Sequence, residues 1–381
     1  MDQPTDAGIP AEEPRDTPLR GEHEALGASF TDFGGWLMPV RYTSDLAEHH
    51  AVRQAAGLFD ISHMGEILVE GGGAGAFLDH ALAGAISAVP VGRAKYTMIL
   101  AEDGGIVDDL IVYRLQDDEF LVIANAGNRE VVARELTDRV AGFDATVEDQ
   151  SDDYALIALQ GPTAERILAE TAGVVELSLP LPEIRNYAWG SVLFGGEPLL
   201  IARTGYTGED GFELLVPVAR AAELWRALLA AGEPHGLVPA GLAARDTLRL
   251  EAGMPLYGHE LSRDIVPAQA GLGRVIPAGK TGFVGEAATE SRPDAPVLIG
   301  LTAEGRRAGR AGYGVFRGDE RVGEITSGAL SPTLGHPIAM AFVRPDALPS
   351  DGAAASDLTI DVRGTRIPAT VTALPFYRRN S

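Results

Sequence analysis

The sequence predicts an α+β fold of two or three domains, the last of which is all β. Its 381 residues, 45% of them hydrophobic, are more than one hydrophobic core usually holds. Up to about residue 250, strand patterns alternate with amphipathic helices, and the order of elements in the first part of this region is repeated in its second part. From about residue 295 the chain changes to short strands separated by glycines, which is typical of a small antiparallel barrel or sandwich.

The elements of the first half follow from residue spacing. Residues 1–17 are acidic, contain proline and have few apolar side chains, so we expect a disordered tail. An amphipathic pattern then predicts a helix at 45–57. Alternation and short loops next predict strands and helices in the order strand 65–71, helix 73–84, strands 95–100, 106–115 and 119–125, and helix 128–140.

The second half repeats this order and then changes. Residues 191–204 form a predicted hairpin with Gly195-Gly196 at its turn, followed by a strand at 211–217 and a helix at 218–232. The terminal domain is expected to contain short strands at 297–303, 313–318, 321–328, 339–344, 358–364 and 366–374.

Composition excludes several functions. The formal net charge is −23, whereas nucleic-acid binding requires Lys and Arg to neutralise phosphates, so no nucleic-acid partner is expected. The absence of cysteine removes disulfides and thiolate chemistry and is compatible with a reducing compartment. No apolar run reaches the roughly 18 residues of a membrane helix, and the N-terminus lacks a signal-peptide pattern. We therefore expect a cytoplasmic protein with no membrane association.

One motif resembles a dinucleotide-binding turn. A strand runs into Gly71-x-Gly73-x-x-Ala76 and then a helix. No acidic residue closes a second strand about 20 positions later, and no parallel βαβ series follows. A plain tight turn is the favoured interpretation.

The histidines and serines suggest neither a metal site nor a hydrolase. The eight histidines form no HExxH or comparable ligand pattern, and His49 and His50 are expected at the surface or rim of a helix. His63 is ambiguous. No serine nucleophile elbow is present.

Four segments are not explained by packing alone. Asp108 and Asp109 are adjacent on a strand, where successive side chains face opposite sides, so alternation cannot decide which one faces a site. The other three are an acidic glycine loop at 202–214, a helix at 241–261 expected to bury an Arg-Asp pair, and a loop of small and hydroxyl residues at 324–335.

Taken together, these segments resemble the T protein of the glycine cleavage system, a family of tetrahydrofolate-dependent aminomethyltransferases. The resemblance covers nearly everything beyond residue 17, in one order. Its segments include TPLRGEHEALGASFTDFGGWLMPVRYTS, KYTMILAEDGGIVDDLIVY, RTGYTGEDGFEL, GLAARDTLRLEAGMPLYG, GEITSGALSPTLG and PFYRR.

The resemblance implies a three-domain cloverleaf. A first α+β folate-binding domain is discontinuous, at 18–62 and 150–255, with a second α+β domain inserted at 63–149. A connecting segment at 256–294 leads to a C-terminal antiparallel β-barrel domain at 295–381.

The implied reaction uses tetrahydrofolate as co-substrate and no metal. An aminomethyl group on the lipoyl arm of a carrier, the H protein, gives its methylene carbon to tetrahydrofolate. The products are 5,10-methylenetetrahydrofolate, ammonia and the dihydrolipoyl carrier.

The resemblance also assigns residues. By motif position Asp109 is the catalytic carboxylate, and Glu213 grips the amino and NH edge of the pterin with two hydrogen bonds. Asp108 is then expected on the opposite face, capping a turn or pairing with an arginine outside the site. Arg245 either pairs with a folate carboxylate or holds Glu213. The remaining pocket residues implied by matched motifs are Tyr206, Tyr96, Met64, Asn125 and Arg378.

Two alternatives share the fold. One is a folate-dependent demethylase type that works with a flavin domain, and the other is a non-catalytic folate-binding protein. The residues between 271 and 286 also lack a tryptophan that many relatives carry there, so either carrier docking or local packing is expected to differ from theirs.

Overall fold

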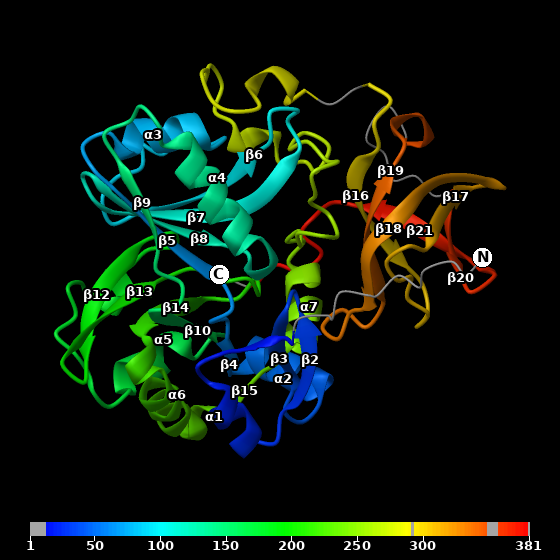
Figure 1. The fold of residues 1–381 in the computed structure, drawn as a ribbon. Coiled ribbons are helices and arrows are strands. Elements are labelled where there is room, and N and C mark those ends of the chain that lie inside the picture. The colour runs from blue at the N-terminus through cyan, green and yellow to red at the C-terminus, as the bar shows by residue number, and fades with distance from the viewer. Residues whose placement is uncertain (1–12, 291–292, 349–356, 380–381) are drawn as a thin grey trace, which may run out of the picture.

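The computed structural model describes residues 13–290, 293–348 and 357–379. Figure 1 shows two α+β units on one side and a barrel on the other, with helix α7 (Leu242–Glu251) between them. The predicted fold class is confirmed, because two mixed units precede a closed antiparallel barrel.

The first unit contains a seven-stranded sheet. In sheet order its strands are β11 (Val174–Val175), β12 (Trp189–Phe194), β13 (Glu197–Ala202), β14 (Gly211–Pro217), β10 (Tyr154–Gln160), β4 (Ala56–Asp60) and β15 (Leu237–Pro239). The surrounding helices are α1 (Arg20–Ala25), α2 (Asp45–Gln54), α5 (Ala164–Glu170), α6 (Val218–Gly232) and α7. Strand β4 precedes the second unit and β10 follows it, which supports a discontinuous first domain, while the exact limits stay predictions.

Helix α6 illustrates why these residues fold this way. Leu224, Trp225 and Leu228 recur at helical spacing and are fully buried against the sheet. Burying such side chains contributes about 1.5–3 kcal/mol each. The predicted helix at 218–232 is therefore confirmed by its packing.

The N-terminal segment differs from the expected disordered tail. Residues 15–16 form β1 (Arg15–Asp16), which pairs in parallel with β3 (Trp36–Arg41), the partner of β2 (Ser29–Phe33). Thr17 is buried and donates a hydrogen bond to Asp60 at 2.6 Å. The composition of residues 1–17 did not indicate this strand, because β1 is ordered by its pairing with β3 and not by its own residues. Residues 1–12 lie outside the described residues.

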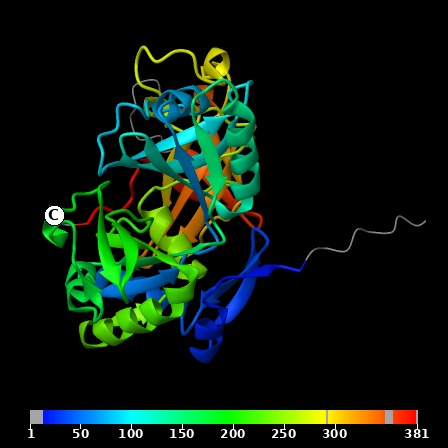
Figure 2. The same ribbon diagram turned by 60° about the vertical axis from the view of Figure 1, so that its left-hand side comes forward.

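The second unit is a five-stranded antiparallel sheet. Its order is β6 (Ala94–Leu100), β7 (Ile106–Gln116), β8 (Glu119–Ala124), β5 (Gly65–Glu70) and β9 (Thr146–Asp149), with helices α3 (Ala74–Ala81) and α4 (Arg129–Arg139). One sheet face packs on these helices, and the other packs on the first unit through Tyr113, Leu121 and Ile123. Figure 2 shows the two units stacked.

The glycines of the supposed dinucleotide motif form a tight turn, as favoured. Gly71 has φ +126°, and a Cβ there would lie 2.5 Å from the carbonyl oxygen of Asp144. The Gly73 N–H donates to the same carbonyl oxygen at 2.8 Å. These glycines therefore permit a close backbone approach.

The barrel closes in the order β16 (Val297–Ala303), β19 (Pro337–Val343), β18 (Glu320–Leu330), β17 (Gly314–Arg317), β20 (Leu358–Val362) and β21 (Thr365–Thr372). Between α7 and β16 the chain has no strand or helix longer than a 3-10 turn among its described residues. This connecting segment packs on the second unit through Leu261, Ala270 and Phe283.

The predicted loop at 324–335 is wrong in its first half, because residues 324–330 belong to β18. The loop that follows this strand joins the barrel to α7. The Glu251 carboxylate, fully buried, accepts hydrogen bonds from the Ser331 hydroxyl, from Thr333 N at 3.0 Å and from Thr333 Oγ1 at 2.7 Å. Arg53 Nη2 donates to the same carboxylate at 2.8 Å. The small and hydroxyl residues of this loop therefore form a polar contact between units.

His49 belongs to this contact, so its expected surface position is wrong. It is fully buried, and its ring nitrogens lie 2.7 Å from Thr247 Oγ1 and 2.9 Å from Thr333 Oγ1. The α2 face that looked solvent-facing in isolation is covered by α7 and the barrel loop. Helical periodicity cannot report a partner so distant in sequence.

In the described part of the chain no helix combines the length and apolar character needed to cross a membrane.

Candidate active site

The site begins at a bulge in β7. The pairing with β6 shifts by one residue between Ile99 and Leu100, just before the two aspartates. Gly105 allows the connecting segment to approach, since a Cβ there would lie 1.9 Å from the Arg263 carbonyl oxygen. Bulges bend a strand and re-aim its side chains, and here the bulge immediately precedes Asp108 and Asp109.

Asp109 is partly exposed and held at both oxygens. Its Oδ2 accepts from the Tyr96 hydroxyl at 2.9 Å, and its Oδ1 accepts from Asn125 Nδ2 at 2.7 Å. Burial raises the pKa of Asp109, and hydrogen bonds from Tyr96 and Asn125 oppose that rise. Three of the residues predicted from the sequence are thereby brought together.

Asp108 contacts a turn, which is one of the two environments predicted for it. It is fully buried and accepts from Asn125 N at 2.9 Å, from Asn125 Nδ2 at 2.9 Å and from Asn128 Nδ2 at 2.8 Å. Among the described residues no arginine pairs with it. The reason is tertiary, because the turn η1 (Ala126–Asn128) after β8 covers this face of β7.

Glu213 lies on β14, in the facing sheet of the first unit. Its Oε2 accepts from Thr204 Oγ1 at 2.5 Å. Burial raises the pKa of Glu213, while the Thr204 hydrogen bond and the charge of Arg245 lower it. The other acids of this glycine loop have structural partners, Glu209 pairing with Arg53 at 2.9 Å and Asp210 with Arg203 at 2.5 Å.

Arg245 is influenced by the charge of Glu213 and has a hydrogen-bond donor without a partner among the described residues. Its Nη1 is buried and has no hydrogen-bond partner among the described residues. Its guanidinium lies 4.7 Å from the ring centroid of Tyr206, a cation–π contact. Burial lowers the pKa of Arg245, and the charges of Tyr206 and Glu213 raise it.

The predicted buried Arg-Asp pair of this helix is wrong. The Asp246 side chain is 54% exposed and pairs with Arg249 at 2.7 Å rather than with Arg245. Residues three apart on a helix are neighbours, whereas adjacent ones diverge. The buried ion pair is instead formed by Arg249 and Glu260, at 3.0 Å.

Tyr187 is a further residue of the candidate site, and no sequence motif indicated it. Burial raises the pKa of Tyr187, and the charges of Glu213 and Asp109 raise it further. Its φ is 56°, a left-handed conformation that costs a non-glycine residue roughly 1–3 kcal/mol. Such strain often marks functional sites, but nothing in the local sequence signals it.

The last two predicted site residues differ in their surroundings. Met64 is half-buried against the apolar cluster between the two sheets. Arg378 is exposed in the C-terminal segment, and the ion pairs and hydrogen bonds of the described residues do not include its side chain. Its neighbour Tyr377 lies under the Arg53 guanidinium, 4.0 Å from ring centroid to Cζ. The roles of both predicted residues stay predictions.

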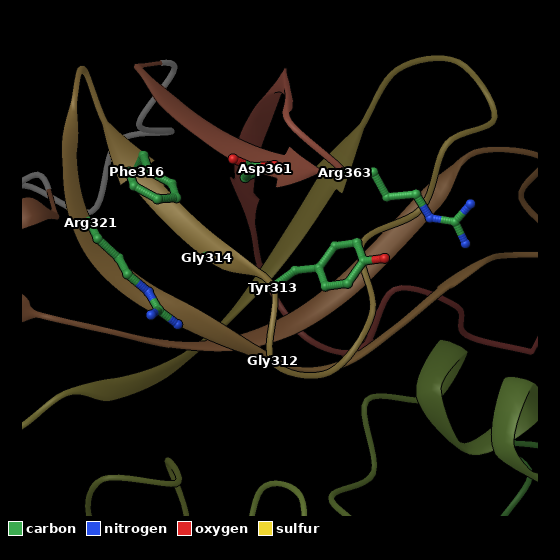
Figure 3. A pocket seen from close by; sticks show the side chains of 7 residues that line it. All are labelled: Gly312, Tyr313, Gly314, Phe316, Arg321, Asp361 and Arg363. Carbon is green, nitrogen blue, oxygen red and sulfur yellow. The ribbon is translucent and has the colours of Figure 1, made fainter.

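A separate hollow of about 360 Å³ lies on the barrel, lined by Gly312, Tyr313, Gly314, Phe316, Arg321, Asp361 and Arg363. Its charged groups are largely neutralised, since Arg321 pairs with Glu324, and Asp361 lies 3.8 Å from Arg366. Figure 3 shows Arg363 extending away from Phe316 and Arg321. This hollow does not gather the groups needed for catalysis.

No cluster of three or more histidine, aspartate or glutamate side chains suited to a metal ion occurs in the parts of the chain that the structure describes. The carboxylates of the site are satisfied instead by hydroxyl and amide donors.

A two-unit α+β body with a terminal barrel is the fold of an aminomethyltransferase. Residues 19–280 match the family model of the GCVT N-terminal domain, and residues 297–378 match that of the glycine cleavage T-protein C-terminal barrel domain. The chain belongs to the glycine cleavage T-protein family and is an aminomethyltransferase.

Relatives agree over nearly the full length. The aminomethyltransferase of Cutibacterium acnes is 58% identical across 96% of this chain and 99% of its own, and that of Saccharopolyspora erythraea is 55% identical across 97% and 99%. The solved structure of glycine cleavage system aminomethyltransferase T from Bartonella henselae superposes with a TM-score of 0.86 at 37% identity, covering 95% of this chain and 98% of that one.

Proposed function

We propose that this aminomethyltransferase moves the methylene carbon from an aminomethyl-dihydrolipoyl carrier, the H protein, to tetrahydrofolate. The products are 5,10-methylenetetrahydrofolate, ammonia and the dihydrolipoyl carrier. The observation that carries the proposal is the arrangement of three charged side chains. Tyr96 holds Asp109, Thr204 holds Glu213, and Arg245 lies against the Tyr206 ring with its Nη1 unpartnered among the described residues.

The residues present fit a folate. A pterin edge offers an amino group beside a ring NH, which one carboxylate can accept as a pair of hydrogen bonds, and Glu213 is the carboxylate for that role. The unpartnered Nη1 of Arg245 would be satisfied by a ligand oxygen. Tyr206 and Tyr187 supply aromatic faces for stacking.

Asp109 is assigned the catalytic role. An anion next to the reacting nitrogen orients it and stabilises positive charge that develops during transfer. Because Tyr96 and Asn125 hold both Asp109 oxygens, little reorganisation is needed when that charge forms.

A glycine-synthesis assay with reconstituted lipoylated carrier tests the proposal. Methylenetetrahydrofolate should form only when carrier, tetrahydrofolate and this protein are all present. Tetrahydrofolate binding without carrier-dependent turnover would favour the non-catalytic folate-binding alternative, and turnover with an N-methyl amine and a flavin partner would favour the demethylase type. The cytoplasmic location stays a prediction from the sequence.

Replacing Glu213 by glutamine is expected to weaken tetrahydrofolate binding by about 1–3 kcal/mol, because two pterin donors lose their charged acceptor. Isothermal calorimetry measures this directly. Glu197→Gln, at an exposed position on β13, serves as the matched control and should bind like the parent protein. Equal affinities for both variants would remove Glu213 from the folate site.

A further inference from the structure

Asp108 is a buried carboxylate that the proposed chemistry does not use. Three N–H donors from the segment after β8 converge on its two oxygens, and among the described residues it forms no ion pair. Burying a carboxylate costs several kcal/mol unless hydrogen bonds offset the loss of water. An apolar residue at this position would avoid that cost, so the charge has to be explained.

The Asn125 amide connects the two aspartates. Its Nδ2 lies 2.9 Å from Asp108 Oδ1 and 2.7 Å from Asp109 Oδ1, and the Asp109 carbonyl oxygen is 3.1 Å away. An amide nitrogen has two hydrogens, and each carboxylate can take one of them. A flipped amide would instead place its oxygen against two carboxylate oxygens. The two anions together therefore define one orientation of the amide.

We infer that Asp108 is a positioning residue, whose carboxylate fixes the Asn125 amide so that the amide in turn holds the Asp109 carboxylate in a single orientation. The inference rests on the proposed catalytic role of Asp109. It explains why a charge is kept on the buried face of β7. Small displacements of a reacting group can lower a rate by about a hundredfold.

The ionisation state of Asp108 matters for this role, since a protonated carboxyl has one acceptor position fewer. Burial, followed by the charge of Asp109, raises the pKa of Asp108 to about 7, while hydrogen bonds from Asn128 and Asn125 lower it. From the connecting segment Tyr257 also faces Asp108, and Arg263 lies near Tyr257. As the pH falls through about 7, Asp108 becomes protonated and the Asn125 amide loses its hydrogen bond to an ionised carboxylate.

A double-mutant cycle tests the inference in the carrier-dependent assay at saturating folate. Asp108→Asn and Asn125→Ala should each lower turnover about 10- to 100-fold, and the double variant should be no slower than the slower single one. Folate affinity of Asp108→Asn should change less than about threefold. Two results would overturn the positioning role. One is a double variant whose loss of turnover equals the product of the two single losses, and the other is a folate affinity of Asp108→Asn that falls together with its turnover.

Failure of the two hypotheses is distinguishable, because an inactive parent protein would overturn the proposed function, whereas an active parent with multiplying losses would overturn only the role of Asp108. If Asp108→Asn does not fold, Asn128→Ala replaces it. Asn128→Ala removes one hydrogen bond to the ionised Asp108 carboxylate and so raises the pKa of Asp108. The pH below which turnover declines should therefore move to a higher value. Thr137→Ala, at an exposed position, is the control. If turnover of Asn128→Ala declines at the same pH as that of this control, the inference is contradicted.

Discussion

Asp109→Asn is expected to lower turnover by about two to three orders of magnitude, the scale for losing one preorganised charged group in a transition state. Asparagine keeps the size of the side chain but removes the anion, and its amide oxygen can still accept from Asn125 while its NH₂ faces the Tyr96 hydroxyl. Tetrahydrofolate affinity should change little, because the contact matters most when positive charge develops.

The measurement is a single-turnover and steady-state comparison in the carrier-dependent assay, with folate affinity determined separately. Asp117→Asn is the matched control, since that side chain is 96% exposed at the β7–β8 turn. Melting temperatures of both variants should resemble that of the parent. A variant at position 109 that kept more than about a tenth of the parent turnover would exclude Asp109 as the catalytic carboxylate.

Glu251→Gln is expected to destabilise the protein by about 1–3 kcal/mol, because Arg53 loses one of its two buried carboxylate partners and keeps only Glu209. The Arg53 and Glu251 side chains are 5% and 0% exposed. Glutamine keeps one oxygen for Ser331 and Thr333 N but replaces the oxygen that accepts from Thr333 Oγ1 and Arg53, so the contact between α7 and the barrel should weaken. Calorimetric unfolding would then show the barrel melting at a lower temperature than the parent protein.

Protonation of Glu251 at low pH should also destabilise the parent protein. Burial alone would raise the pKa of Glu251, but hydrogen bonds and charge from His49, Ser331 and Arg53 outweigh it and lower the value from 4.5 to about 2. Since the folded pKa is depressed, this stabilisation is present above the unfolded value of about 4.5 and is lost as the pH falls toward 2, by about 3 kcal/mol.

The exposed pair Arg321–Glu324 provides the control for this contact. Both side chains are more than half exposed, so Glu324→Gln should cost under about 1 kcal/mol. If Glu251→Gln were equally mild, the buried network would not hold the barrel in place.

Elements with strong periodicity could be predicted from the sequence alone. The strand pattern of 106–115 became β7, the amphipathic spacing of 218–232 became α6, and six glycine-punctuated segments became the closed barrel. Each follows from side-chain alternation or helical spacing, which is local information. By contrast, residues 13–17 looked disordered because the partner of β1 is another strand, β3.

The candidate site was predictable only in part. Motif resemblance named Asp109, Asn125 and Tyr96, and the structure brings them within hydrogen-bonding distance. Tyr187 escaped prediction, because a left-handed φ at a tyrosine is imposed by its surroundings. His49 was assigned to the surface because α2 in isolation leaves it there.

The sequence by itself determined the family, the order of secondary structure and the strand on which the two aspartates lie. Only the tertiary structure decided their environments. Alternation places Asp108 and Asp109 on opposite faces, but whether a face meets solvent, an arginine or an asparagine depends on segments folded over it. Here the η1 turn and the connecting segment close over β7, so Asp108 is buried beside Asn125 and Asn128 while Asp109 stays partly exposed. Burial and hydrogen bonding set the charge of a carboxylate, and both arise from residues distant in the chain or from turns whose path the fold directs.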